Sequence, residues 1–183
     1  AATARLLAAQ GCHVVINYSR SADAAEQVAS ACGKLGVETL VCRADVASDA
    51  ECRAMVDQAL KKWGHVDIVV NNAGTTKFCE HSDLEGLDAQ DFQSIYAVNV
   101  IGPYQMIRAA AAAMQSQEQG GVVVNVASTA AITGVGSSVA YAASKGALVT
   151  MTLSLARALG PKIRINAVCP GFIQGDWLRE GLG

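Results

Sequence analysis

Short apolar runs alternate with segments of helical periodicity along the whole of this 183-residue chain. The alternation predicts repeated βα units, and therefore a parallel sheet with helices on both of its faces. We expect strands at 12–18, 37–43, 66–71, 121–127 and 163–169, and helices near 1–10, 21–34, 48–62, 88–117 and 140–160. Because no linker or repeat interrupts this pattern, the expected fold is a single α/β domain over 1–183 with a doubly wound parallel sheet.

Composition excludes several classes of partner. The net charge is −2, and the lysines and arginines are scattered, so there is no basic stripe for nucleic acid or an anionic membrane surface. Apolar runs such as 109–114 and 122–127 are much shorter than the roughly 20 residues that span a bilayer. The six cysteines form no CxxC pair and no Cys/His group, so we expect reduced thiols, no metal site and a cytoplasmic protein.

Motifs that suit ligand binding follow several of the expected strands. Ligands of open α/β sheets bind beyond the carboxyl ends of the strands, which meet at one edge of the sheet. The residues at these ends are Asp45 and Val46, the motif NNAG at 71–74, Ser128, and Pro170 with Gly171. The sequence therefore predicts a binding site along this edge.

A phenol and an ammonium lie one turn apart near the start of the last expected helix. Tyr141 and Lys145 are four residues apart, which places them on the same side of a helix. A neighbouring cation favours the phenolate, so we expect Lys145 to lower the pKa of Tyr141 toward neutrality. A tyrosine tuned in this way can exchange a proton with a substrate oxygen.

Five motifs together resemble the short-chain dehydrogenase/reductase family in order and spacing. They are NNAG (71–74), NVIG (99–102), Ser128, YAASK (141–145) and CPGFI (169–173). The resemblance extends over essentially the whole chain and is strongest to 3-oxoacyl-[acyl-carrier-protein] reductases. It implies a Rossmann fold and hydride transfer between a nicotinamide and a carbonyl or secondary alcohol. The catalytic residues that it implies are Asn99, Ser128, Tyr141 and Lys145.

The resemblance also implies a role for each of these side chains. Ser128 hydrogen-bonds the substrate oxygen and orients it toward Tyr141. Asn99 disturbs its own helix and holds a water that links the lysine to solvent; the alternative is a buried capping amide. Pro103 independently predicts a break in that helix.

For the cofactor, the resemblance implies contacts at most of the strand ends. The expected cofactor-binding residues are Tyr18, Ser19, Arg20, Asp45, Val46, Asn71, Ala73, Gly74, Tyr141, Lys145, Pro170, Gly171 and Ile173. Two alternatives stay open, because NNAG can be a tight structural turn and Asp45 can cap the helix at 48. Gly175 stands where the family commonly has a threonine, and Trp177 and Leu178 are expected beside Ser128 in the substrate site.

The residues after the strand at 12–18 predict NADP(H) rather than NAD(H). NAD-specific members of the family place an acidic residue where this chain has Tyr18. Without that carboxylate, Arg20 with Ser19 and Ser21 can bind a 2′-phosphate. The alternative is that Arg20 is only a solvated residue at the start of the next helix.

Two parts of the family pattern are missing from the 183 residues. Neither the glycine-rich turn with the first strand nor the last strand with its terminal helix is present. We therefore expect a sequence that is incomplete at both ends, with a gap between the strands at 12–18 and 66–71, since the family's first strand lies between them.

Among functions, reduction of a 3-oxoacyl thioester is the leading expectation. The segment AAAMQSQEQGG (111–121) has no basic residue for an acidic carrier protein, so a sugar, steroid or small ketone substrate stays open. A non-catalytic dinucleotide-binding regulator and an epimerase or dehydratase stay open as well. The apolar outer faces of the helices at 88–117 and 140–160 predict a homotetramer or homodimer.

Overall fold

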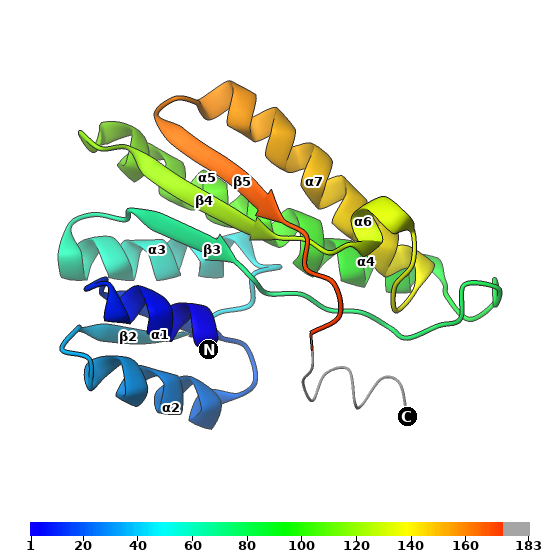
Figure 1. The fold of residues 1–183 in the computed structure, drawn as a ribbon, viewed down its shortest axis with the longest axis horizontal. Helices are drawn as coiled ribbons and strands as arrows, with labels where there is room; N and C mark the ends of the chain where they lie inside the picture. The colour runs from blue at the N-terminus through cyan, green and yellow to red at the C-terminus, as the bar shows by residue number, and fades with distance from the viewer. Residues whose placement is uncertain (174–183) are drawn as a thin grey trace.

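A computed structural model describes residues 1–173 of the chain and shows the predicted alternation of strands and helices (Figure 1). Its elements are α1 (Ala2–Ala9), β1 (Val14–Tyr18), α2 (Ala22–Gly33), β2 (Thr39–Arg43), α3 (Asp49–Trp63), β3 (Ile68–Asn71), α4 (Ala89–Tyr96), the π-helix η1 (Ala97–Ile101), α5 (Gly102–Ser116), β4 (Gly121–Val126), α6 (Ala130–Thr133), α7 (Val139–Leu159) and β5 (Ile163–Val168). Two differences concern the helices. The segment expected as one helix at 88–117 is divided into α4, η1 and α5, and the short α6 was not expected.

The strands form two separate parallel sheets. One contains β1 and β2, and the other has the order β3-β4-β5. Tyr18 pairs with Arg43 at the end of the first sheet, and Asn71 pairs with Asn125 in the second. No strand within residues 1–173 joins β1 to β3, so the doubly wound sheet lacks its central strand, as the sequence predicts.

Helices α5 and α7 pack on the same face of the β3-β4-β5 sheet. Their apolar side chains share one core cluster with inward-facing residues of the strands, including Ile107, Met114, Val123 and Ile163. On β5, however, Arg164 and Asn166 alternate with the buried residues and are exposed. Within the described residues, α5 and α7 thus cover one face of β5, and its other face is exposed.

The two sheets are connected through the contact between α3 and α5. Arg108 of α5 forms a 2.6 Å ion pair with Asp49 of α3, and the Gln105 amide donates a 2.8 Å hydrogen bond to the Val46 carbonyl. A Cβ at residue 102 would lie 2.8 Å from the Val46 side chain, so the start of α5 needs Gly102. Val46 therefore helps to pack α5 beside the start of α3.

One described helix, α7, is long and apolar enough by length and composition to cross a membrane. The core helix of a soluble protein passes the same test, and 33% of the apolar stretch of α7 is buried. It lies against β5 and carries the buried polar side chains Ser144, Lys145 and Thr152. Its outer face remains apolar, with Leu153 54% exposed.

Candidate active site

The carboxyl ends of β3, β4 and β5 meet the N-terminal end of α7 at one edge of the sheet (Figure 1). The segments that follow β4 and β5 run side by side, because Thr129 N–H donates to the Pro170 carbonyl at 2.9 Å. On α7, the Ser138 hydroxyl accepts a 3.2 Å hydrogen bond from Tyr141 N–H and so caps the helix. The predicted motifs are thereby brought together.

Ser128 and Tyr141 are in direct contact across this edge. A hydrogen bond joins their hydroxyl groups. Ser128 is also held from behind, since its oxygen accepts a 3.1 Å hydrogen bond from Ala130 N–H. That second bond fixes the serine at the point where β4 turns into α6, and both hydroxyls can address the same substrate oxygen.

Lys145 lies deeper, with only 4% of its surface exposed. Its ammonium donates a 2.9 Å hydrogen bond to the Val126 carbonyl and lies 5.6 Å from the centre of the Tyr141 ring. Burial lowers the pKa of Lys145 to about 8. The ammonium is therefore still mostly charged near neutral pH.

The pKa of Tyr141 moves in the opposite direction from the sequence-based expectation. Burial raises the pKa of the phenol, and the hydrogen bond to Ser128 only partly opposes this effect. The lowering expected from Lys145 was wrong for this structure, because burial has the largest effect on the pKa of the Tyr141 phenol. Tyr141 is therefore protonated near neutrality and is suited to donate a proton.

Asn99 is fully buried in the π-helix η1, which confirms the local helix disturbance expected there. Its side-chain oxygen accepts from Thr75 N–H at 2.8 Å, and its amide nitrogen donates to the Thr75 carbonyl and the Ser144 hydroxyl at 2.9 Å each. Ser144 in turn donates to the Tyr141 carbonyl at 2.7 Å. Asn99 thus connects the loop after β3 to the turn of α7 that carries Tyr141.

Because the Asn99 amide is occupied by protein partners, a proton relay at this residue would use its backbone carbonyl. Pro103, four residues later, has no N–H to donate to that carbonyl. The α-helical bond from residue 103 to that carbonyl therefore cannot form. The water relay itself stays a prediction.

The NNAG motif divides into a buried part and an exposed part. Asn71 points into the sheet and donates a 2.8 Å hydrogen bond to Asn125, which donates in turn to Thr152 at 2.8 Å. Asn71 therefore holds β3, β4 and α7 together. Ala73 and Gly74 are exposed at the edge, and a Cβ at Gly74 would lie 3.6 Å from both Asn99 Oδ1 and Lys145 Nζ. Gly74 is the place where a ligand can approach these two groups.

At the other sheet, a hollow of about 590 Å³ opens beside the ends of β1 and β2. Its lining residues are Ser19, Arg20, Arg43, Asp45 and Glu51. Ser19, Arg20 and Asp45 were expected here, but Arg43 was not. Arg43 lies here because strand pairing places it opposite Tyr18, and this pairing cannot be read from a single sequence.

Other expected cofactor residues have structural contacts of their own. Tyr18 packs against the core between β1 and α2, so Ser19 and Arg20 are the exposed residues of that turn. Asp45 Oδ1 accepts from Ala47 N–H at 3.0 Å, and Glu51 accepts from Asp45 N–H at 2.8 Å, so Asp45 forms a turn before α3 and is not its N-cap. Ser48 begins α3 by accepting from Glu51 N–H.

The end of β5 contributes residues to the same edge. The Pro170 carbonyl is bonded to Thr129, Gly171 lies beside that threonine, and Ile173 is 63% exposed. The expected substrate residues Trp177 and Leu178, and Gly175, lie outside the described residues.

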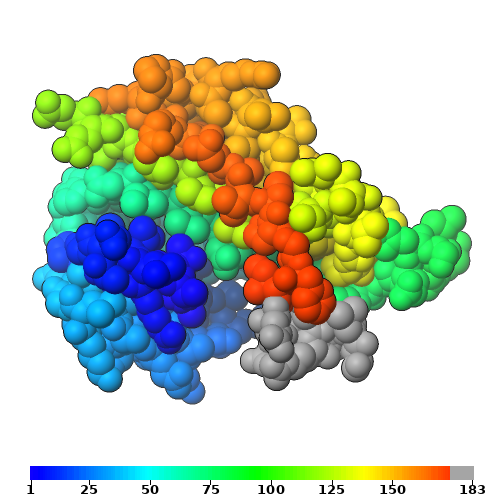
Figure 2. All heavy atoms as spheres, in the orientation of Figure 1, coloured from blue at the N-terminus to red at the C-terminus, as the bar shows by residue number. Residues whose placement is uncertain are grey.

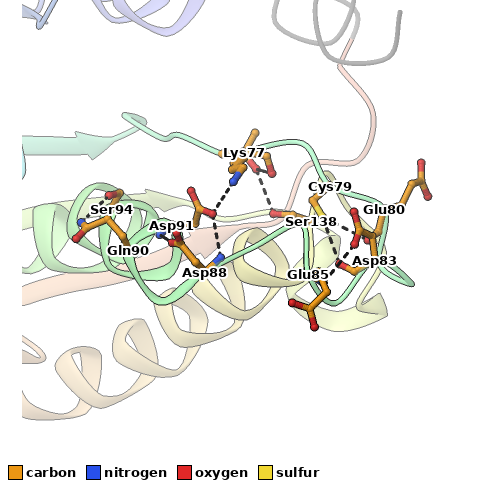
Figure 3. A network of polar contacts seen from close by, with 11 residues as sticks. Lys77, Cys79, Glu80, Asp83, Glu85, Asp88, Gln90, Asp91, Ser94 and Ser138 are labelled. Atoms are coloured by element: carbon orange, nitrogen blue, oxygen red, sulfur yellow. Dashed lines mark hydrogen bonds and ion pairs between the residues drawn. The ribbon is translucent and has the colours of Figure 1, made fainter.

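A segment that the sequence did not single out lies against the loop that precedes α7. Residues 75–88 project from one end of the molecule next to the 130–140 region (Figure 2). Thr76 is bonded to Ser137 at 2.8 Å, and His81 to the Gly136 carbonyl at 3.1 Å. Figure 3 shows Lys77 facing Asp91, with which it forms an ion pair that lowers the pKa of the carboxyl. These contacts hold the segment against the loop that precedes α7.

The exposed residues of the edge fit a dinucleotide cofactor. The hollow between Ser19, Arg20 and Arg43 can take the adenosine end, and Gly74 offers exposed backbone beside Lys145 at the other end. A side chain at residue 74 would occupy the space next to that ammonium. The residues present would therefore hold the cofactor along the carboxyl ends of both sheets.

Comparison with known proteins agrees with this arrangement. The family model for short chain dehydrogenases matches residues 1–181. A protein from Streptomyces violaceoruber, named as ketoacyl reductase 2 of the granaticin polyketide synthase, is 40% identical over 177 residues, which cover 97% of this chain and 69% of that protein.

Solved structures share the fold over nearly the whole chain. One from Burkholderia xenovorans, described as a short-chain dehydrogenase/reductase, has a TM-score of 0.92 and 43% identity, and the match covers 97% of this chain and 74% of that chain. A xylitol dehydrogenase with bound NAD⁺ has a TM-score of 0.89 and 29% identity, and the match covers 98% of this chain and 68% of that chain.

Proposed function

The chain belongs to the short-chain dehydrogenase/reductase family of oxidoreductases, and we propose that it is an NADP(H)-dependent carbonyl reductase whose leading substrate class is a 3-oxoacyl thioester. The observation that carries this proposal is the Ser128 to Tyr141 hydrogen bond beside the buried Lys145. The similarity to a protein named as a ketoacyl reductase supports the substrate class.

In this proposal each side chain of the edge has one task. The bound cofactor supplies or accepts the hydride. Ser128 donates a hydrogen bond to the substrate oxygen and fixes it beside the phenol. Tyr141 donates its proton to that oxygen as negative charge develops, which suits a phenol whose pKa is raised by burial. Lys145 holds a positive charge 5.6 Å from the centre of the Tyr141 ring and would hold the ribose next to the nicotinamide.

The proposal extends to the cofactor, the assembly and the location. Arg20 with Ser19 favours NADP(H) over NAD(H), because Tyr18 stands where NAD-specific members of the family have a carboxylate. Ile101, Tyr104 and Leu153 are large exposed side chains on η1, α5 and α7, which supports a homodimer or homotetramer formed through these helices. A cytoplasmic location is proposed for an enzyme with these free cysteines.

Two alternatives have distinct signatures. A sugar, steroid or small ketone substrate is favoured by the absence of basic residues at 111–121. A regulator that binds the dinucleotide without turnover is disfavoured by the assembled Asn99, Ser128, Tyr141 and Lys145 set.

The test is a screen of 3-oxoacyl thioesters, ketones and sugars that follows NADPH absorbance, with wild type compared to Tyr141→Phe. We expect the substitution to lower kcat by about a hundredfold or more with cofactor affinity nearly unchanged, because only the proton-transfer group is lost. Tyr104→Phe, at an exposed tyrosine on α5, is the matched control. Activity of Tyr141→Phe within a few-fold of wild type contradicts the mechanism, and cofactor binding without turnover of any substrate favours the regulator.

A further inference from the structure

Arg43 occupies a defined place at the mouth of the hollow beside β1 and β2. It is the last residue of β2, and its register partner Tyr18 is the last residue of β1. The chain turns directly from Tyr18 into Ser19 and Arg20, so strand pairing brings two arginines to the rim of one hollow of about 590 Å³.

Neither arginine is neutralised by the described part of the chain. The ion pairs within residues 1–173 involve other basic side chains, and both Arg20 and Arg43 are exposed. Two carboxylates, those of Asp45 and Glu51, also line the hollow, but they accept hydrogen bonds from backbone N–H groups at the start of α3. Both guanidinium groups therefore have donors to spare for an anion.

We propose that Arg43 is a second ligand for the 2′-phosphate of NADP(H), acting with Arg20 from the neighbouring strand end; this inference rests on the cofactor proposed above. A phosphate carries several acceptor oxygens, and guanidinium groups bind them through paired N–H donors. Ser19 and Ser21 add hydroxyl donors at the same turn, and the Ser21 side chain does not cap α2. The hollow thus has the chemistry of a phosphate site on the adenosine side of the cofactor.

The competing explanation is that Arg43 binds no ligand. A charged residue at a strand end can simply keep an exposed edge soluble. The two explanations differ in a measurable way, because a solubilising residue affects NADP⁺ and NAD⁺ equally, whereas a phosphate ligand affects only the cofactor with the phosphate.

The experiment measures dissociation constants by titration calorimetry for NADP⁺, NAD⁺ and adenosine 2′,5′-bisphosphate, with no substrate present. We expect Arg43→Ala to weaken NADP⁺ and the bisphosphate by about tenfold or more and NAD⁺ by less than about twofold. Arg43→Lys keeps the charge but not the paired donors, so its loss is intermediate. Arg157→Ala, at an exposed arginine near the end of α7, is the control.

A second variant is expected to change the affinity for NADP⁺ in the opposite direction. Glu51→Gln removes a negative charge from the lining yet keeps an acceptor for Asp45 N–H, so NADP⁺ binds about two- to threefold more tightly while NAD⁺ is unchanged. Circular dichroism checks that each variant is folded, and Arg43→Gln replaces the alanine variant if that protein is unstable.

The failures are distinguishable. If wild type prefers NADP⁺ and Arg20→Ala removes the preference while Arg43→Ala leaves it, the role of Arg43 is overturned and the cofactor proposal stands. Equal weakening of NADP⁺ and NAD⁺ by Arg43→Ala also overturns it. If wild type binds both cofactors equally, the NADP(H) proposal itself fails and this inference fails with it.

Discussion

Replacing the buried lysine by methionine is expected to make the protein more stable and inactive. Lys145 is 4% exposed, and burial lowers its pKa from 10.5 to about 8. At about 1.4 kcal/mol for each pKa unit, that difference is a cost of about 3 kcal/mol to the folded state below the folded pKa. Methionine has a similar length and no charge, so Lys145→Met removes this cost.

Part of the gain is offset by a lost hydrogen bond. The ammonium donates to the Val126 carbonyl at 2.9 Å, and removing that donor costs about 1 to 2 kcal/mol. The net expectation is a free energy of unfolding about 1 to 2 kcal/mol higher than that of wild type at about pH 7. Activity is lost, because the charge beside Tyr141 is gone.

The pH dependence has a definite sign. Since the folded pKa lies below the unfolded one, the unfolded state binds more protons between about pH 8 and 10.5, and the stability of wild type rises through that window. The burial cost is fully present below about pH 8 and falls to roughly half by about pH 9.5. The advantage of Lys145→Met is therefore largest near neutrality and is almost gone at about pH 9.5.

The assay is urea unfolding of the cofactor-free protein at about pH 7 and about pH 9.5, followed by circular dichroism. Lys61→Met, at an exposed lysine on α3, controls for the methionine itself and should show no such pH-dependent gain. A Lys145→Met protein that is no more stable than wild type near neutrality, with a difference that does not change with pH, refutes the burial argument.

Two further predictions concern positioning and assembly. Ser144→Ala removes the acceptor for Asn99 and should lower kcat about three- to tenfold, leave the KM for the cofactor unchanged and cost about 1 to 2 kcal/mol of stability. Steady-state kinetics and urea unfolding compare this variant with the control Ser154→Ala. Equal behaviour of the two variants contradicts the prediction. Light scattering of the full-length protein after size exclusion should give two or four times the mass of one chain, and Leu153→Glu should reduce it. A wild-type protein that is monomeric at all concentrations would end this proposal.

Local patterns in the sequence were sufficient for the strands and most helices. Apolar runs predicted every strand, but the starts at 12, 37 and 66 were two residues early, since a strand begins only where a neighbour pairs with it. The short α6 was missed because four residues are too few to show a helical period.

The proposed catalytic set could be predicted from the family resemblance, but its electrostatics could not. The distance along the chain between Tyr141 and Lys145 gives their shared helix face, whereas the pKa of the phenol depends on burial beneath segments far away in sequence. Arg43 shows the same limit, because its place beside Arg20 follows from pairing between two strands. Tertiary contacts decide both properties.

The π-helix has a consequence for how this site can change during evolution. A turn with i to i+5 bonding contains one residue more than an α-helical turn, and one residue corresponds to a rotation of about 100°. Deleting a single codon within Ala97–Ile101 would give a more regular helix with the same composition, yet it would turn Asn99 away from Thr75 and Ser144. We therefore expect the Asn99 contacts to depend on the number of residues in η1 as well as on the identity of the side chain.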